Sequence, residues 1–224
     1  MKYVTIVTGA SKGIGLALVK DLLEKGHIVV GTSRSGNIEE LDDSKFIAKT
    51  LDLSDPSSIS EFVVEVKKLD SEPNLLINNA GVGPDLDTDR PNQETFNITF
   101  DVNVKGTVFL TEQLAELMPT GSKIINISSI MGSVENTDSY DSVAYRMSKS
   151  ALNMYSKILS NRYEGKIDVA NVHPGWVRTD ITPSAKKHGR LTPNESASNI
   201  INYLENHFKN GAYWDAEKAE PIKW

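Results

Sequence analysis

The feature that most constrains the fold of this chain is a regular alternation between two kinds of segment. Short apolar runs rich in β-branched residues are separated by longer stretches. In these stretches, apolar residues recur every three or four positions, as on one face of a helix. The short runs cover residues 3–8, 27–33, 46–53, 74–81, 122–129, 166–175 and 212–214. Buried strands that alternate with helices form parallel sheets with right-handed connections. We therefore predict an α/β fold, a doubly wound, mostly parallel sheet in a three-layer α/β/α sandwich, with residues 1–224 as a single domain.

Local signals place several of the connecting segments. A capping residue followed by proline marks helix starts at residues 55–56 and 192–193. The second start has a capping-box pattern and predicts a last helix that runs to about Phe208. We expect a long helical stretch over roughly residues 93–117 and a mobile loop over residues 176–191.

The first strand is followed by a glycine-rich turn at the edge where ligands of doubly wound sheets bind. The sequence TGASKGIG covers residues 8–15 and leads from the strand into a helix. Gly9, Gly13 and Gly15 let the backbone approach a ligand, and the helix N-terminus offers N–H groups and a positive dipole end to a pyrophosphate. The turn predicts a nucleotide site, although its spacing is neither the common dinucleotide fingerprint nor a P-loop.

The segment YRMSK places Tyr145 four residues before Lys149, which brings both side chains onto one face of a helix. A phenol has an ordinary pKa near ~10, and a neighbouring cation lowers that pKa because it favours the phenolate. Such a pair can serve as a general acid and base. An isolated pair of this kind is more often an exposed helical pair without function.

The glycine turn also contains a competing pattern. Residues 9–13, GASKG, match the Gly-x-Ser-x-Gly elbow of serine hydrolases, in which Ser11 would be the nucleophile and His173 a candidate base. This alternative leaves Gly15 and the pair of Tyr145 and Lys149 without a role. The nucleotide site gives all three a role, so we favour it.

Taken together and in order, the motifs of this chain resemble those of the short-chain dehydrogenase/reductase family. They are the TGASKGIG turn, NNAG at 78–81, Asn103 in DVNVKG, Ser129 in INISS, Tyr145-x-x-x-Lys149 and PGWVRT at 174–179. HPGWVRTD and the compact length resemble the C-factor/sniffer-type carbonyl reductase branch of that family. The resemblance implies a Rossmann-type sheet of about seven strands, a nicotinamide cofactor and hydride transfer between that cofactor and a carbonyl or alcohol substrate.

The resemblance further implies a catalytic tetrad of Asn103, Ser129, Tyr145 and Lys149. Tyr145 would be the general acid and base, and Ser129 would hydrogen-bond the same substrate oxygen. Lys149 would also hold the nicotinamide ribose, and Asn103 would order a water that links Lys149 to solvent. Ser128 makes the serine ambiguous by one position, and the alternation of the preceding strand favours Ser129. For Asn103, a hydrogen bond to backbone within a helix is a fair rival.

The same resemblance implies a set of cofactor contacts. Besides Tyr145 and Lys149 they are Gly9, Ser11, Lys12, Gly13, Ile14, Gly15, Ser33, Arg34, Asp52, Leu53, Asn79, Ala80, Gly81, Pro174, Gly175, Val177 and Thr179. An acidic residue after the second strand would bind a ribose 2′-hydroxyl, whereas a basic residue suits a 2′-phosphate. The second strand ends in Ser33 and Arg34 and carries no acid there, so we predict NADP(H). The alternative is that Arg34 is a solvated loop residue.

We expect an apolar substrate pocket that is lined, beside Ser129, by Met131, Tyr140, Trp176 and Ile181. Such a pocket favours an apolar or aromatic ketone or aldehyde, although each of these side chains could equally be a packing residue. The interval from Ser129 to Tyr145 is longer than the family's usual one, and the chain after Thr179 is shorter. Both departures border the pocket, so they leave the substrate class open.

Composition narrows the classes of function. Lys plus Arg number 24 and Asp plus Glu number 30, and the resulting charge of -6 argues against a nucleic-acid-binding face and against a polybasic membrane contact. The sequence has no cysteine, which excludes disulfides and thiolate metal sites, and its 4 histidines are scattered, so we predict no metal.

The sequence carries no recognisable secretory leader and no apolar run of membrane-spanning length, so we expect a cytoplasmic protein. Its partner would be a small carbonyl or alcohol substrate. Family members associate through the helices at 93–117 and 143–163, which implies a homo-oligomer, either a dimer or a tetramer. A non-catalytic nucleotide-sensing or signalling protein on the same scaffold is the alternative function.

Overall fold

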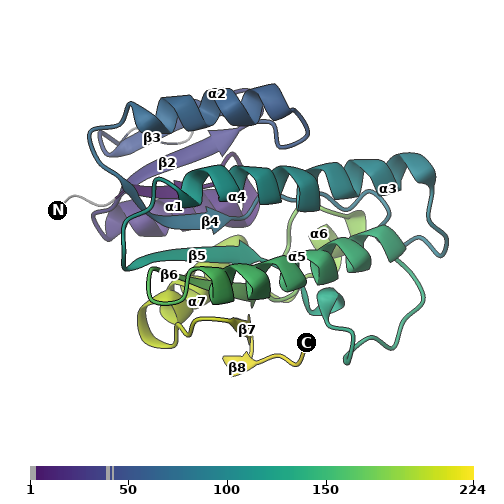
Figure 1. The fold of residues 1–224 in the computed structure, drawn as a ribbon. Coiled ribbons are helices and arrows are strands. Elements are labelled where there is room, and N and C mark those ends of the chain that lie inside the picture. Colours follow the sequence, from purple (N-terminus) through teal and green to yellow (C-terminus); the bar gives the residue numbers. More distant parts are fainter. Residues whose placement is uncertain (1–3, 39–40, 42) are drawn as a thin grey trace.

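A computed structural model of the chain describes residues 4–38, 41 and 43–224. Its centre is an eight-stranded sheet in the order β3-β2-β1-β4-β5-β6-β7-β8 (Figure 1). The strands are β1 (Val4–Val7), β2 (Ile28–Ser33), β3 (Phe46–Thr50), β4 (Pro73–Asn78), β5 (Ser122–Ile127), β6 (Ile167–His173), β7 (Ala212–Asp215) and β8 (Glu220–Pro221). All neighbours run parallel except β7 and β8, which are antiparallel. The strand order reverses between β1 and β4, and the predicted doubly wound α/β fold is confirmed.

Helices cover both faces of this sheet (Figure 1). They are α1 (Gly13–Glu24), α2 (Pro56–Lys67), α3 (Gln93–Phe100), η1 (Asp101–Gly106), α4 (Thr107–Ala115), η2 (Ile130–Gly132), α5 (Val143–Arg162), α6 (Pro183–His188) and α7 (Pro193–Asn206). Apolar residues of α1 and α7 pack on one face, and those of α2, α4 and α5 pack on the other. The sheet is packed between these two hydrophobic cores. Its carboxyl edge therefore gives the loops that follow the strands a rigid support.

Most strand predictions match the described residues, with differences at the ends. Tyr3, the first residue of the first predicted run, lies outside the described residues. The third strand ends at Thr50, three residues early, because Leu51–Ser54 turns away from β2 toward α2. The predicted terminal strand is present as β7, but β8 was not predicted because two residues give no periodicity to detect.

The long helical stretch predicted over roughly residues 93–117 is present, but it is not one regular α-helix. The segment begins as α3, continues as the π-helical turn η1 and ends as α4. At the end of η1, a Cβ on Gly106 would lie 2.0 Å from the Leu53 carbonyl oxygen. The helix thus passes very close to the chain that follows β3. Its inserted residue leaves no trace in the apolar periodicity, and turns of this type are frequent at functional sites.

Residues 176–191, which we predicted to be a mobile loop, include the short helix α6. Thr182 caps this helix by accepting a hydrogen bond from the Ala185 N–H at 2.9 Å, and Pro183 occupies its first turn. Thr182-Pro183 repeats the helix-start pattern of Thr192-Pro193, a capping residue followed by proline. The start of α6 could therefore have been predicted from the sequence.

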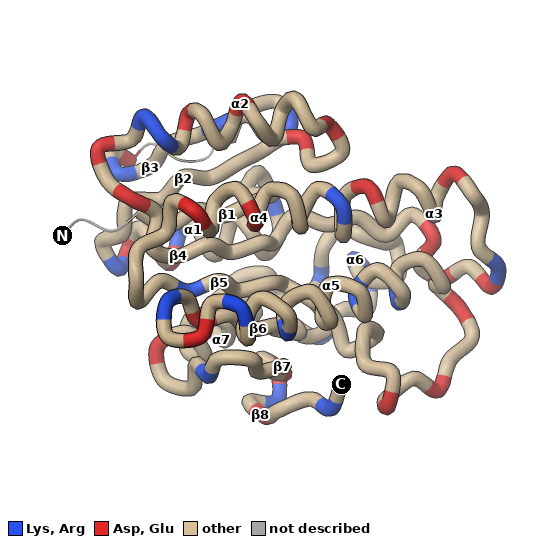
Figure 2. Tube along the Cα trace, in the orientation of Figure 1, with Lys and Arg blue, Asp and Glu red and all other residues tan. Residues whose placement is uncertain are grey.

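Charged side chains of both signs are interspersed along the described chain (Figure 2). Within the described residues, no helix has both the length and the apolar character needed to cross a bilayer. The same part of the chain holds no group of three or more His, Asp or Glu residues that could bind a metal ion.

Candidate active site

The loops after β1, β4, β5 and β6 meet at the carboxyl edge of the sheet and surround a cavity of about 460 Å³. Many residues that the sequence singled out line it: Ile14, Asn79, Gly81, Ser129, Met131, Tyr145, Lys149, Pro174, Gly175, Trp176, Val177, Thr179 and Ile181. The structure therefore brings both ends of the predicted motif series, which lie more than half the chain apart, to one place.

The glycine turn is built so tightly that two of its positions accept only glycine. Gly9 has a φ of +67°, and a Cβ there would lie 2.9 Å from the Ala80 Cα. A Cβ on Gly15 would lie 2.2 Å from the Gly9 carbonyl oxygen and 2.5 Å from the Asn79 Nδ2. The turn thus folds back on itself and against the loop after β4, which leaves its outer side open to a ligand.

Asn79 is the side chain that holds this turn. Its Nδ2 donates to the carbonyl oxygens of Thr8 at 2.9 Å and Gly9 at 3.1 Å. The Thr8 hydroxyl in turn accepts from the N–H groups of Asn79 and Ala80, both at 3.0 Å. The NNAG motif therefore acts on the glycine turn through hydrogen bonds between the loops after β1 and β4.

The N-terminus of α1 lies beside this turn and keeps its N–H groups available. Its N-cap residue, Lys12, makes no side-chain capping hydrogen bond, and the first turn holds no acidic residue. Lys12 instead reaches Asp180 of the loop after β6, with 3.3 Å between Nζ and Oδ2. Ser11 is exposed beside it, and Gly13, with a φ of +59°, faces the Thr179 methyl group. This arrangement suits the binding of a phosphate or pyrophosphate.

Ser33 and Arg34 end β2 next to the glycine turn. Ser33 is buried and its hydroxyl lies 3.4 Å from that of Ser35, whereas Arg34 is exposed. Across from them, Asp52 accepts hydrogen bonds from the hydroxyl and N–H of Ser54, and these bonds, with a smaller contribution from Arg34, lower the pKa of Asp52. Leu53 is buried next to it. Arg34 is thus an exposed cation at the carboxyl end of β2, near Asp52.

Tyr145 and Lys149 both lie buried on the cavity side of α5. The Lys149 Nζ lies 5.6 Å from the centroid of the Tyr145 ring and donates to the Ile127 carbonyl oxygen at 2.9 Å. A Cβ on Gly81 would lie 3.6 Å from the same Nζ, so the loop after β4 passes close to the ammonium group. The predicted helical spacing therefore places both side chains at the cavity, next to the predicted cofactor loop.

In this structure the pKa of Tyr145 is raised overall rather than lowered. Burial raises the pKa of Tyr145 to about 12, and the hydrogen bond with Ser129 opposes this rise only in part. Burial also lowers the pKa of Lys149 to about 8. Both groups follow the rule that a low-dielectric site disfavours the charged form, and at neutral pH the phenol is a proton donor.

The two candidate serines after β5 have different surroundings. The Ser128 hydroxyl donates to the Asn153 Oδ1 at 2.7 Å. Ser129 is the residue whose side chain acts on Tyr145, since it lowers the pKa of that phenol, and its hydroxyl accepts from the Met131 N–H at 3.2 Å. The Ser129 carbonyl oxygen accepts a further bond from the Tyr213 hydroxyl. Of the two, Ser129 therefore shares the position at which a substrate oxygen would meet the phenol.

Asn103 lies in the π-helical turn η1 and is buried. Its Oδ1 accepts from the Val82 N–H, and its Nδ2 donates to the Val82 carbonyl oxygen, each at 2.8 Å. The Nδ2 also lies 3.2 Å from the Ser148 hydroxyl. The side chain therefore bonds to backbone of another segment rather than within its own helix, and it ties the loop after β4 to η1 and α5.

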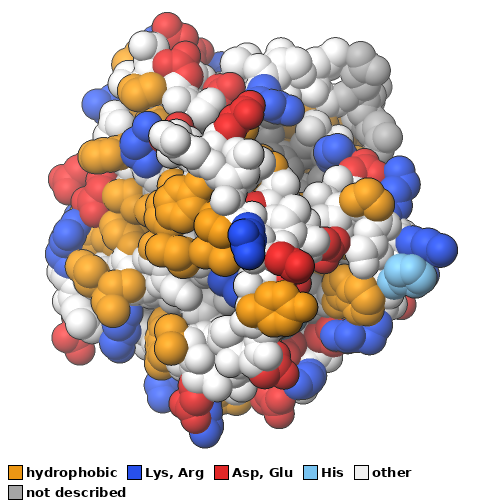
Figure 3. All heavy atoms as spheres, turned by 90° about the vertical axis from the view of Figure 1, so that its right-hand side faces the viewer, with side chains coloured by type: hydrophobic (Ala, Val, Ile, Leu, Met, Phe, Trp, Pro, Cys, Tyr) orange, Lys and Arg blue, Asp and Glu red, His pale blue; other side chains and the backbone are white. Residues whose placement is uncertain are grey.

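The predicted substrate wall is placed in part at the cavity. Met131, Trp176 and Ile181 line it, whereas Tyr140 is 80% exposed and lies outside its lining. Hydrophobic side chains gather on the face of the molecule that lies on the right in Figure 1, as Figure 3 shows. Sequence reasoning missed a further set of lining residues: Leu86, Asp87, Ile127, Ile130, Thr182, Ser184, Ala185 and Arg190. The helix-start signal Thr182-Pro183 and the carboxyl ends of β5 and β6 could have pointed to several of these residues. No sequence signal marked Leu86 and Asp87.

The hydrolase alternative finds no support in these contacts. Ser11 is exposed and outside the cavity lining, whereas His173 is buried in it. No hydrogen bond joins the two side chains among the described residues, and burial lowers the pKa of His173 to about 4. The nucleophile and base of an elbow need to be within hydrogen-bond reach.

A match to a known family shows to which family the chain belongs. The family model described as short chain dehydrogenase matches residues 3–189. The chain belongs to the short-chain dehydrogenase/reductase family. The recognition made from the motifs is thereby confirmed, and members of this family are oxidoreductases that use nicotinamide cofactors.

Relatives and solved structures agree with this family membership. An uncharacterized oxidoreductase of Methylorubrum extorquens is 34% identical over 191 residues, which cover 81% of this chain and 76% of that protein. The structure of the carbonyl reductase Sniffer of D. melanogaster has a TM-score of 0.88 and 28% identity, and each chain is covered to 100%. NADPH-bound carbonyl reductase from chicken fatty liver has a TM-score of 0.85 and 28% identity, with coverage of 100% and 99%. The chain thus resembles the sniffer branch.

Proposed function

We propose that this protein is an NADPH-dependent carbonyl reductase that reduces a ketone or aldehyde, with Tyr145 as the general acid. The observation that carries the proposal is that Tyr145, Ser129 and Lys149 line the same cavity as the loops that flank the glycine turn. One unit of the fold would then hold both the cofactor and the catalytic groups.

The residues present fit an NADP(H) molecule. The uncapped N-terminus of α1 suits the pyrophosphate, and Arg34 with Ser33 suits the ribose 2′-phosphate, since no acidic residue ends β2. A carbonyl reductase of similar fold, from chicken fatty liver, supports this preference because it was solved with NADPH bound. When bound, NADPH supplies the hydride.

The chain's own residues would handle the proton. A substrate oxygen gains negative charge as its carbon is reduced, and the protonated Tyr145 donates to it. Ser129 holds the same oxygen through its hydroxyl. Lys149, whose pKa burial brings to about 8, is mostly charged at neutral pH, and its charge beside the ring stabilises the phenolate that forms as the proton leaves.

The cavity favours a substrate with an apolar or aromatic body. Met131, Leu86, Trp176 and Ile181 supply apolar surface around the catalytic groups. The carbonyl would point to Tyr145 and Ser129, and the apolar body would lie toward these four side chains. Both ends of such a substrate then meet groups of matching polarity.

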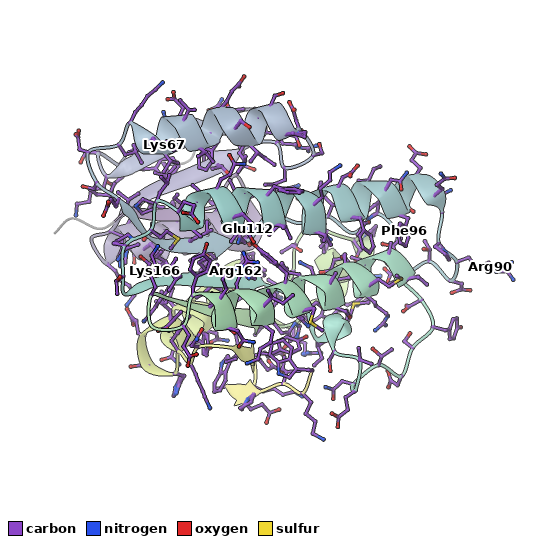
Figure 4. All side chains as sticks on the ribbon, in the orientation of Figure 1. Lys67, Arg90, Phe96, Glu112, Arg162 and Lys166 are labelled. Atoms are coloured by element: carbon purple, nitrogen blue, oxygen red, sulfur yellow. The ribbon has the colours of Figure 1, made fainter. Side chains whose placement is uncertain are left out.

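A second copy of the chain is the proposed protein partner. Phe109 of α4 and Met154 and Ile158 of α5 are exposed apolar residues on the outer face of the same layer. Figure 4 shows Glu112 and Arg162 directed toward one another between these helices, and Arg162 Nη1 contacts both Glu112 oxygens at 2.8 and 2.7 Å. This pair braces α4 against α5, which supports a preformed association surface.

The proposal is tested by mixing the protein with NADPH and a panel of ketones and aldehydes and following the loss of NADPH absorbance. We expect turnover with apolar carbonyls and a loss of about 100-fold or more in kcat for Tyr145→Phe. Ser11→Ala separates the hydrolase alternative, since it should leave the chemical step intact. Turnover that survives Tyr145→Phe, or NADPH binding without turnover of any carbonyl, would reject the proposal in favour of another base or of a nucleotide sensor.

A further inference from the structure

Asp85, in the loop between β4 and α3, is a buried carboxylate that no motif singles out. Its side chain is 1% exposed, although aspartate is rarely buried to this degree without a partner. Its Oδ2 accepts from the N–H of Ala144 at 2.7 Å and from the N–H of Tyr145 at 3.2 Å. These are first-turn N–H groups of α5, so Asp85 caps this helix from another segment of the chain.

The N-terminus of α5 needs this external cap. Its own N-cap residue, Ser142, makes no side-chain capping hydrogen bond and has a φ of +56°, a left-handed conformation that serine rarely adopts. The Ser142 hydroxyl instead accepts from the N–H of Asp87 at 3.1 Å, and Asp87 has a φ of +66°. Two strained residues therefore face each other across the contact, and such strain persists only where surrounding bonds hold it.

The same contact carries part of the cavity wall. Leu86 and Asp87, the two residues after Asp85, line the cavity together with Tyr145. A Cβ on Gly83 would lie 2.4 Å from Leu86 Cδ1 and 3.0 Å from Tyr145 Cδ2, so the loop presses Leu86 close to the phenol ring. Tyr145 and the wall residues Leu86 and Asp87 are thus held together by one contact between this loop and the first turn of α5.

We propose that Asp85 is a positioning residue for Tyr145, whose carboxylate locks the first turn of α5 to the Leu86–Asp87 wall so that the phenol and the substrate wall keep one geometry. The inference rests on the proposed function, because Tyr145 is there the proton donor. The bond to the Tyr145 N–H is direct, and a small shift of a catalytic group is costly for the chemical step.

The charge of Asp85 adds a second effect. Its Oδ1 has no hydrogen-bond partner among the described residues, so the carboxylate is only partly neutralised by its two N–H bonds. The other groups near the phenol are Lys149 on α5, Ser129 after β5 and Tyr213 on β7. Asp85 therefore supplies negative charge on this side of Tyr145 and favours the protonated phenol, the form that reduction needs.

The test compares Asp85→Ala and Asp85→Asn with Asn92→Ala. Asn92 lies in the same loop, is exposed and caps α3 by accepting from the Glu94 N–H at 2.8 Å, so its loss removes a cap without touching the cavity. We expect Asp85→Ala to lower kcat by about 100-fold and Asp85→Asn, which keeps one acceptor, by about tenfold, with NADPH affinity within about twofold of the wild type. Asn92→Ala should lower thermal stability alone.

Two further readouts do not depend on turnover. Amide hydrogen exchange of residues 142–149 should speed up in Asp85→Ala and stay unchanged in Asn92→Ala. The absorbance titration assigned to Tyr145, by difference from Tyr145→Phe, should begin at lower pH in Asp85→Asn. If the wild type turns over no carbonyl, the proposed function fails, yet these readouts still decide the role of Asp85. An Asp85→Asn protein with wild-type kcat, exchange and titration would overturn the inference.

Discussion

The two sides of the proposed active site are built from different material. The cofactor wall, which is the glycine turn beside the cavity, is made by backbone, since Gly9 and Gly15 fold onto each other and leave no room for a Cβ. The catalytic wall is made by side chains, since Tyr145, Ser129 and Lys149 reach the cavity from a helix and a loop. The cofactor wall therefore depends on the absence of side chains at its glycines, and the catalytic wall depends on the presence of particular side chains.

This difference separates shape from chemistry. A backbone wall loses its form when any side chain is added, because the colliding atoms are main-chain atoms that cannot move alone. A side-chain wall keeps its form under isosteric change and loses only the group that reacts. Substitutions in the two walls should accordingly fail in different ways.

The largest effect is expected for Gly15→Ala. Its Cβ would lie 2.2 Å from the Gly9 carbonyl oxygen, so the turn must open, and we expect NADPH affinity to fall by about 100-fold or more and stability by about 2–4 kcal/mol. Calorimetric binding and thermal unfolding measure the two losses. Gly121→Ala is the control for binding: Gly121 has a φ of +89°, so the variant should lose stability through backbone strain, but a Cβ there meets nothing within 4 Å and NADPH affinity should stay unchanged. Unchanged NADPH affinity in Gly15→Ala would contradict the description of a backbone wall.

Lys149→Met should have the opposite effect on stability: kcat should fall, while the free energy of unfolding should rise. We expect kcat to fall by about 100-fold, because the cation beside the phenol is gone. Burial lowers the pKa of Lys149 from 10.5 to about 8, so below pH 8 the folded wild type carries a buried charge that the variant lacks.

The pH dependence fixes the sign of this stability effect. Between pH 8 and 10.5 the unfolded lysine holds its proton while the folded one releases it, so the stability of the wild type rises with pH relative to the variant. The stability gain of Lys149→Met, about 3 kcal/mol at most near pH 7, should therefore shrink at pH 10. Denaturant unfolding at both pH values measures it, with exposed Lys157→Met as the control. A gain that stays constant with pH would show that the lysine is not strained by burial.

A smaller effect, on selectivity rather than on turnover, is expected for Arg34→Asp at the edge of the cofactor wall. Arg34 is exposed, so its substitution should leave the fold intact while replacing a phosphate-binding cation by an acid that suits a ribose 2′-hydroxyl. We expect the ratio of kcat/KM for NADPH over NADH to fall by about 10- to 100-fold. An unchanged ratio would move the recognition of the phosphate to Lys12 or Ser33.

The contrast between the walls also explains what could be predicted from the sequence. The fold, the glycine turn and the spacing of Tyr145 and Lys149 are local patterns whose geometry follows from one strand or one helix. Tyr140 and Asp85 show where this ends. Tyr140 looks like a pocket residue but points to solvent, and Asp85 looks like a loop residue but is buried against α5. The packing of the loop after β4 on α5 buries Asp85, and the course of the chain between η2 and α5 leaves Tyr140 exposed; no periodicity encodes either.

The smallest effect is expected behind the catalytic wall, for Tyr213→Phe. The Tyr213 hydroxyl donates to the Ser129 carbonyl oxygen, and its loss leaves the ring packed but frees the backbone that presents the Ser129 hydroxyl. Because that hydroxyl partly offsets the raised pKa of Tyr145, we expect a loss of about three- to tenfold in kcat/KM and a higher apparent pKa in the pH profile of alcohol oxidation. Tyr203→Phe removes an equally buried hydroxyl whose partner is the Lys209 N–H at 3.5 Å, away from the cavity, and should change neither quantity. A pH profile that shifts equally in both variants would mean that the side-chain wall needs no support from β7.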